Sequence, residues 1–428
     1  MIKCQIVLKG VATRFQECSE LSIYVHCYGH VLSLATKDCL SQITLLRNTL
    51  GTIQALYVFL EASPKRHALF MKSGEPGEFV RTLKSQCATR WTAAEGSRKA
   101  VEAELMTIIR ALHQLSQDQD SKVSSEATSL LIAVSSFDFL FGMSVLKIIL
   151  PHTSHLSAYV QSVNIDVLKV KQNADLVIKT LESCRSDDSY ETVWLLTERN
   201  SDRVKAALDE NDIDIDFREA KLPRQRPSTR RLGTVQPTCQ NTVFSDVKEF
   251  HKITHYFPAL DKIIMELTTR FGENDNKILC SLGKLLSLEQ PDDETFKTVS
   301  EFYKFDEGSL RADHKLYTHA KKNIDDNGSA SSLFKQLMDH GVLEMIPTLG
   351  KALKVFAVIP ATSCSSERSF SSLRRLKTYL RSMMGQERLS NLAILHIETE
   401  FVNKVLQQDM ESMINTFGGK SGRNTKFF

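Results

Sequence analysis

The stretch from Ser136 to Leu150 limits the possible folds of this chain more than any other feature. A helix drawn through it is apolar on nearly every side, and a helix of that kind has to be buried. We therefore expect a central helix within a helical domain. Proline cannot continue the hydrogen-bond ladder of a helix, so we expect Pro151 to end it. Its apolar residues are Phe137, Phe139, Leu140, Phe141, Met143, Val145, Leu146, Ile148 and Ile149.

Helical spacing of apolar residues recurs along the rest of the chain. Between Lys99 and Gln117 it places apolar side chains at 101, 105, 108, 109 and 112. The residues around the break at Gly74–Gly77 predict one helix on each side of it. Further helices are predicted over residues 10–19, from 30 towards 60, and over 157–181, 191–208, 243–271 and 343–358. The fold class that follows is mainly α.

One short segment, residues 22–27, favours a strand because it is rich in β-branched and aromatic residues. A lone strand leaves backbone edges unpaired. Either the β-compatible residues near Cys4 pair with it, or the chain is a fragment of a longer protein. A two-stranded remnant would need helices packed against it to be stable.

The composition is that of an ordinary globular protein: 428 residues, 42% hydrophobic and 25% charged. A net charge of +3 is too small to indicate nucleic-acid binding by itself. The nine cysteines form no Cys-x-x-Cys pair, which favours reduced, intracellular thiols over a disulfide framework. The start carries too short an apolar run for a signal peptide, and no run of 18 apolar residues predicts a membrane span. We expect no cofactor.

Two polar segments divide the helical region. Residues 209–216 are acidic and are expected to form a solvated loop instead of a cation site. Residues 221–231 combine proline with Lys221, Arg224, Arg226, Arg230 and Arg231, which predicts an exposed linker. Such a stretch could also serve as a nuclear localisation signal or contact phosphate groups. The final residues, 418–426, are expected to be disordered.

The segment that follows Pro360 predicts two adjacent amphipathic helices, over residues 363–381 and 386–401. The Thr/Ser run after Pro360 offers N-cap oxygens, which places Glu367 in the first turn as a capping carboxylate. Two apolar helices near a terminus suit pairing with another chain, although they could also pack on their own domain. The side chains predicted to make a dimer contact are Phe370, Leu373, Leu380, Leu389, Leu392 and Ile397.

The words Ala-Thr-Ser-Cys-Ser-Ser-Glu-Arg-Ser-Phe-Ser and Arg381 to Ile397 resemble the C-terminal dimerisation region of hAT-superfamily transposases. The likeness is greatest to domesticated members of the zinc-finger MYM-type and THAP-type groups. It implies that Glu367 is the last acid of an Asp-Asp-Glu metal site. Tyr-Val-His-Cys-Tyr-Gly-His, with Cys27 and His30, and Thr-Arg-Trp, with Arg90 and Trp91, also resemble hAT motifs.

Each family motif has a structural alternative. A zinc site needs four ligands, and no second pair follows Cys27 and His30, so we predict a packed junction and no metal. In active relatives the tryptophan stacks on DNA bases, as a ring beside an arginine can. Trp91 could equally anchor the core, and we favour the core here.

The first two acids of the family site have no counterpart in this sequence. The resemblance places them upstream of the Cys-x-x-His segment, where residues 1–30 offer only Glu17 and Glu20. A two-metal site holds ions roughly 4 Å apart with several carboxylates, and Glu367 alone leaves each ion short of ligands. We therefore predict no strand cleavage by this chain.

The sequence therefore predicts a mainly α remnant of an RNase-H-like fold with a large all-α insertion. The predicted divisions are 1–60 (partial RNase-H-like remnant), 61–355 (helical insertion with a basic linker near 210–242), 356–405 (dimerisation region) and 406–428 (partly disordered tail). The predicted function is dimerisation by a catalytically inactive hAT-derived protein. A nuclear DNA-binding regulator with weak DNA contact is the alternative, and an active transposase the third possibility. The resemblance and the basic stretch favour the nucleus, otherwise the cytoplasm.

Overall fold

The computed structural model describes residues 11–75, 77, 79–86, 92–162, 167–222, 244–272, 277–286, 291–322, 330–378 and 383–418. These residues divide into two compact units, Met1–Ala361 and Thr362–Phe428, which are treated separately below. The described residues are mostly helical and contain no sheet, and one isolated bridge joins Ser136 to Arg218. The prediction of a mainly α protein is confirmed.

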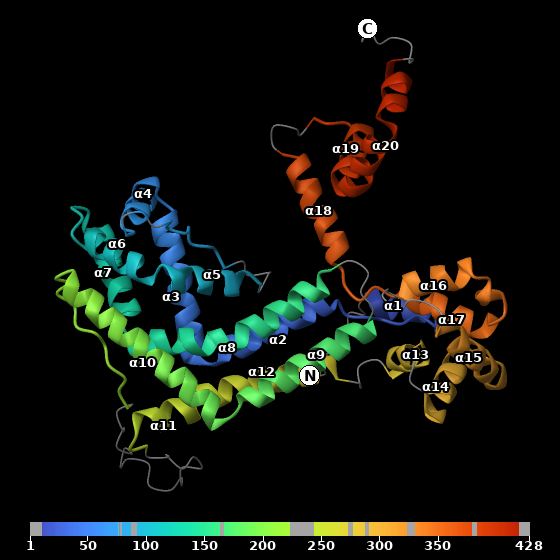
Figure 1. Cartoon of the computed structure of the whole chain (residues 1–428), viewed down its shortest axis with the longest axis horizontal. Helices are drawn as coiled ribbons and strands as arrows, with labels where there is room; N and C mark the ends of the chain where they lie inside the picture. Colours follow the sequence, from blue (N-terminus) through green and yellow to red (C-terminus); the bar gives the residue numbers. More distant parts are fainter. Residues whose placement is uncertain are drawn as a thin grey trace, which may run out of the picture. The chain divides into compact units, whose positions relative to one another are not determined.

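Helix α8 (Phe137–Val160) is the buried centre of the first unit. Fifteen of its residues are buried, including every apolar position from Phe139 to Leu146. Helices α2 (Tyr28–Gln42), α3 (Thr44–Glu61), α5 (Thr92–Ala103), α9 (Val167–Cys184) and α10 (Asp187–Glu210) all pack against it. Figure 1 shows α2, α8, α9 and α12 (Phe257–Phe271) running side by side. The predicted central helix is therefore confirmed.

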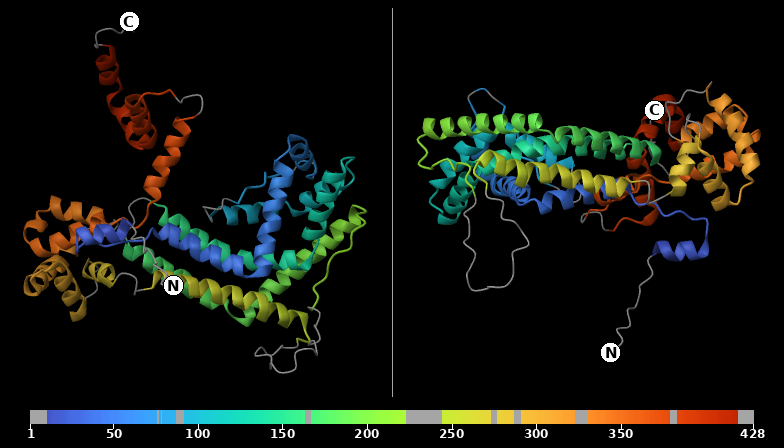
Figure 2. Two further views of the ribbon diagram at one scale, coloured as in Figure 1. Left: turned by 180° about the vertical axis from the view of Figure 1, so that it is seen from behind. Right: turned by 90° about the horizontal axis from the view of Figure 1, so that it is seen from below.

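The remaining helices of this unit form two groups. At one end of α8 lie α4 (Pro64–Lys72), α6 (Leu105–Ser116) and α7 (Ser121–Val134). Helix α11 (Val247–His251) continues through a π-helical turn (Lys252–Tyr256) into α12. The second group comprises α13 (Lys277–Leu286), α14 (Asp293–Tyr303), α15 (Glu307–Lys321), α16 (Ala330–Asp339), a 3-10 turn (Val342–Glu344) and α17 (Pro347–Val358). The short helix α1 (Val11–Cys18) precedes them all, and Figure 2 gives two further views.

The second group of helices is joined by polar contacts from α15. The carboxylate of Asp313 accepts hydrogen bonds from the backbone N–H groups of Thr348 and Leu349, at 2.7 and 3.0 Å, and so caps the start of α17. Tyr317 and Lys321 both donate to the carbonyl oxygen of Leu286 at the end of α13. These bonds satisfy backbone groups at helix ends, which would otherwise be unpaired.

Three local predictions are wrong, and the first concerns Pro151. The proline lies inside α8, which continues to Val160. Proline in a helix interior costs about 3 kcal/mol or more, but Leu150 and Leu156 are buried on either side of it. The proline cannot donate to the Lys147 carbonyl one turn earlier, while the hydroxyl of Thr153 donates to the carbonyl oxygens of Ile149 and Leu150. Burial on both sides outweighs the lost bond.

The other two wrong predictions concern extended segments. Residues 22–27 form no strand, because no strand among the described residues lies beside them to pair with. Instead, the side chains of Ile23 and Val25 pack on the core. Residues 79–86 are extended, where a helix was predicted. Their N–H groups donate to side chains: Arg81 to Glu104, Leu83 to Glu61 and Gln86 to Gln54. Side-chain acceptors on neighbouring helices thus replace the helical ladder.

Gly142 of α8 lies against Thr49 of α3, so we expect a methyl group added at Gly142 to destabilise the protein. A Cβ at this position would overlap the Thr49 hydroxyl and lie 3.0 Å from Thr49 Cβ. Because overpacking a core typically costs 1–3 kcal/mol, we expect Gly142→Ala to lower the free energy of unfolding by about that amount. Gly51→Ala in α3 meets nothing within 4 Å and should be neutral or stabilising. Urea unfolding of both variants measures this, and equal stabilities would contradict it.

His255 predicts a dependence of stability on pH. Burial, together with the neighbouring His251, lowers the pKa of His255 from 6.5 to about 4. Between those two pH values the unfolded chain binds a proton there that the folded chain does not, so unfolding becomes easier as the pH falls. We expect His255→Phe to flatten this part of the curve of unfolding free energy against pH. An unchanged slope between pH 6.5 and 4 would contradict the assignment.

Candidate self-association surface

The described residues of the second unit form three helices: α18 (Cys364–Leu376), α19 (Gln386–Ile397) and α20 (Thr399–Gly418). Helix α18 packs on α19, and α19 contacts α20. Helix α20 continues well beyond residue 406, into the segment predicted as a partly disordered tail, with non-helical backbone at Asp409. Residues 419–428 lie outside the described residues, so the expectation of disorder there stays a prediction.

The first turn of α18 contains Glu367, as predicted. Its carboxylate accepts a hydrogen bond from the Ser363 hydroxyl at 2.7 Å, and its N–H donates to the Ser363 carbonyl at 3.0 Å. The Thr362 hydroxyl accepts from the N–H of Cys364 at 3.4 Å. These contacts close the start of the helix around an exposed carboxylate, which the helix dipole also favours.

Large apolar side chains of this unit are exposed. Phe370 is 70% exposed, Ile394 is 59% exposed and Phe401 is 66% exposed. The exposed set is Phe370, Met383, Ile394, Leu395, Ile397, Phe401, Met410, Met413, Ile414 and Phe417, here called the apolar C-terminal surface. Contiguous exposed apolar patches mark protein interaction sites, so these side chains are candidates for a contact with another chain.

The same unit has almost no interior of its own. Leu389, at 7% exposure, is the buried apolar residue among those described between 362 and 418. A three-helix unit of this kind buries little apolar surface within itself. Burial supplies most of the favourable free energy of folding, so little of it is available within this unit itself.

The predicted contact residues fall into three groups. Phe370 and Ile397 are exposed, whereas Leu373 and Leu392 are half-buried. Leu389 is buried within the chain itself, and Leu380 lies outside the described residues. Whether these six side chains contact a second chain stays a prediction.

The sequence prediction omitted most of α20. Met410, Met413, Ile414 and Phe417 recur at helical spacing, and Phe401 lies one turn into the same helix. This spacing was a usable signal of an amphipathic helix. The apolar C-terminal surface is therefore longer than the predicted contact set.

Comparison with known proteins finds a family for part of this unit. The family model of the hAT family C-terminal dimerisation region matches residues 341–401. The 52 kDa repressor of the inhibitor of the protein kinase from Homo sapiens is 24% identical over 434 aligned positions, covering 96% of this chain and 53% of that protein. The protein of the same name from Mus musculus is 23% identical over 435 positions, with the same coverage.

The match over residues 341–401 makes this chain similar to hAT transposase-derived proteins. It spans about half the length of the curated relatives that it matches. No solved structure matches it. None of the helices in the described ranges is long and apolar enough to cross a membrane.

The Cys-x-x-His motif of this hAT-like protein lies at the start of α2. Cys27 is half-buried and precedes the helix, while His30 is exposed on it. The N–H of Tyr28 donates to the carbonyl oxygen of Ala361 at 3.2 Å. This bond joins the beginning of α2 to the segment that follows α17, so the motif marks a packed helix start within the first unit.

The remaining family motif positions give no evidence of a metal-binding cluster among the described residues. Arg90 and Trp91 lie outside the described residues. Among the residues that the structure does describe, no three His, Cys, Asp or Glu side chains lie close enough to hold a metal ion. The roles of Cys27, His30 and Glu367 stay predictions from the resemblance.

Proposed function

We propose that this hAT-like protein acts by pairing with a second copy of itself through α18, α19 and α20. The observation that carries the proposal is the apolar C-terminal surface on a unit whose own interior is nearly confined to Leu389. The match to a family dimerisation region over residues 341–401 supports the same partner. A closed pair also covers the surface of both copies at once, because a two-fold interface uses the same patch twice.

The amount of exposed apolar surface suits such an interface. A stable complex buries roughly 800 Å² on each partner, and an aromatic side chain can bury on the order of 150–250 Å². The apolar C-terminal surface includes three phenylalanines and three methionines. Aromatic residues and methionine are the types enriched at the centres of protein interfaces.

Substitution of Phe370 or Phe401 by Asp should weaken the dimer strongly. Burying one such side chain contributes about 1.5–3 kcal/mol, and each substitution occurs twice in a two-fold dimer. We therefore expect the dissociation constant to rise on the order of a hundredfold or more. Sedimentation velocity over a range of protein concentrations measures the dissociation constant.

Two matched variants separate association from folding. Phe79→Asp places the same change at an 86% exposed phenylalanine of the first unit and should leave the dimer intact. Leu389→Asp should instead reduce helix content, because Leu389 is buried within the chain. A wild-type protein that stays monomeric at all concentrations would contradict the proposal.

We further propose that these 428 residues carry no strand-cleaving activity. In the hAT resemblance Glu367 is the last of three acids, and a two-metal site needs several carboxylates. Glu367 is exposed, and its carboxylate accepts a hydrogen bond from the Ser363 hydroxyl. Magnesium- or manganese-dependent nicking by the purified chain, abolished in Glu367→Gln, would contradict this.

The predicted domain divisions form part of the same proposal. The helices between residues 61 and 355 would correspond to the helical insertion of hAT transposases, and residues 1–60 to what remains of the RNase-H-like part. The long α-helical body of the first unit supports this correspondence. Superposition on a hAT transposase would test it, and a different helix order would contradict it.

The second candidate function is a domesticated regulator that acts in the nucleus. Its support is that both curated relatives are named as repressors, and that residues 221–231 are basic. Of that basic stretch, residues 223–231 lie outside the described residues. Imaging of the tagged protein tests the location, and exclusion from the nucleus would contradict it.

If this candidate regulator contacts DNA, its affinity for DNA should depend on the salt concentration. Each phosphate neutralised by Lys or Arg releases counterions, so affinity should fall steeply as salt is raised. A gel shift of duplex DNA measured between about 50 and 200 mM salt gives the slope. The absence of a shift at every salt concentration would eliminate this candidate and leave the dimerisation proposal untouched.

A further inference from the structure

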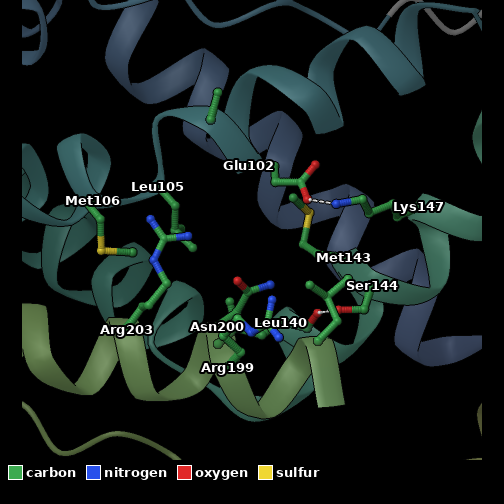
Figure 3. A pocket seen from close by; sticks show the side chains of 12 residues that line it. Glu102, Leu105, Met106, Leu140, Met143, Ser144, Lys147, Arg199, Asn200 and Arg203 are labelled. Carbon is green, nitrogen blue, oxygen red and sulfur yellow. Dashed lines mark hydrogen bonds and ion pairs between the residues drawn. The ribbon is translucent and has the colours of Figure 1, made fainter. Parts of the chain in front are cut away.

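A pocket of about 220 Å³ opens between α5, α6, α8 and α10, within the first unit. Figure 3 shows Glu102 and Lys147 on one wall, joined by an ion pair, and Arg203 reaching from α10 towards Leu105 and Met106. None of the described residues that line it belongs to the apolar C-terminal surface or to the Cys27–His30 motif. Its walls combine charged groups with the side chains of Met106 and Met143.

The single carboxylate in the pocket wall, Glu102, is fully engaged. Lys147 Nζ donates to its Oε1 at 2.7 Å, and the buried Arg98 Nη1 donates to its Oε2 at 2.6 Å. Arg98 also forms two hydrogen bonds with Glu95. Lys99 Nζ also lies 3.2 Å from Glu95 Oε1, so three cations (Arg98, Lys99 and Lys147) neutralise Glu95 and Glu102.

The opposite wall carries two solvent-exposed arginines that form no ion pair with any described residue. Arg199 and Arg203 lie one turn apart on α10. Within the described ranges, neither guanidinium has a hydrogen bond or an ion pair within 4.0 Å, and the neighbouring Asp202 reaches neither of them. Like charges at this spacing repel each other by a few tenths of a kcal/mol. An anion bound between them would relieve that repulsion.

The arginines favour one class of anion. A guanidinium presents a planar fork of N–H donors that matches the oxygens of phosphate. Two forks suit a group with three oxygens and nearly two negative charges, which describes a phosphate monoester. Met106 and Met143 would contact an apolar group attached to that phosphate, since thioethers pack well on rings.

The volume limits the size of the ligand. A cavity of about 150 Å³ can hold a benzene ring, whereas pockets for drug-sized ligands begin near 300 Å³. The pocket therefore has room for one ring and one phosphate, but not for a nucleotide.

We propose that this pocket binds an aryl phosphate monoester, with its phosphate on Arg199 and Arg203 and its ring against Met106 and Met143. Such a group could be a small molecule or the side chain of a phosphorylated tyrosine in a peptide. The chemistry of recognition is the same for both.

Calorimetric titration with phenyl phosphate tests the site. We expect binding to the wild-type chain, weaker binding of inorganic phosphate and none of phenol. Arg199→Gln and Arg203→Gln should each weaken phenyl phosphate binding at least tenfold, because each removes a charge-assisted fork. Arg203→Lys keeps the positive charge but lacks the planar fork of donors. Its affinity for phenyl phosphate should therefore lie between those of the wild type and Arg203→Gln.

A short phosphotyrosine peptide distinguishes the two sources of the aryl phosphate. Tighter binding of the peptide than of phenyl phosphate would identify a peptide as the ligand, and a peptide that fails to compete with phenyl phosphate would identify a small molecule.

Control variants keep the outcome decisive. Lys179→Gln removes an exposed positive charge from α9 and should change nothing. The melting temperatures of the arginine variants without ligand should equal that of the wild type, because neither arginine has a partner to lose among the described residues. Absence of phenyl phosphate binding at millimolar concentration, or equal weakening in Lys179→Gln, would overturn the proposal. Displacement of phenyl phosphate by duplex DNA would overturn the assignment to a small ligand.

Discussion

The burial of α8 is the constraint on which the first unit depends. Its side chains from Phe139 to Leu146 are buried, so the surrounding helices have to cover it on all sides. Two contacts show how closely they do so. Gly142 allows Thr49 of α3 to approach, and the hydroxyl of Thr197 on α10 donates to that of Ser144 at 3.0 Å. A polar pair this deep is tolerated because both hydroxyls are hydrogen-bonded.

The second unit has no comparable centre. Its helices are amphipathic, yet most of their large apolar side chains are exposed. Among the described residues of this unit, Leu389 is the buried exception. Short isolated helices are marginal in water and gain their stability from packing. The contrast between the two units is thus the physical argument for an outside partner. The match to a family dimerisation region over residues 341–401 supports our proposal that this partner is a second copy.

Sequence reasoning succeeded where a local pattern determined the structure. The all-round apolarity of residues 136–150 predicted α8, and the proline followed by hydroxyl residues predicted the start of α18. It failed where a distant partner decided the outcome. Pro151 stays helical because its neighbours are buried, and residues 79–86 are extended because Glu61 and Glu104 accept their N–H groups.

The pocket shows the same limit of sequence reasoning. The spacing of Arg199 and Arg203 is visible in the sequence, but nothing there indicates that Glu102 and Lys147 lie opposite them and already satisfy each other. Only the packing of α10 against α8 reveals which arginines lack a partner. Charged residues on a helix are mostly solvated, so spacing alone would not have selected these two.

Hydrogen exchange at several protein concentrations tests the central claim most directly. If a second copy covers the apolar C-terminal surface, amide exchange in α18, α19 and α20 should slow as concentration rises, while exchange in α8 stays constant. Exchange in residues 364–418 that is equally fast at every concentration would contradict the account.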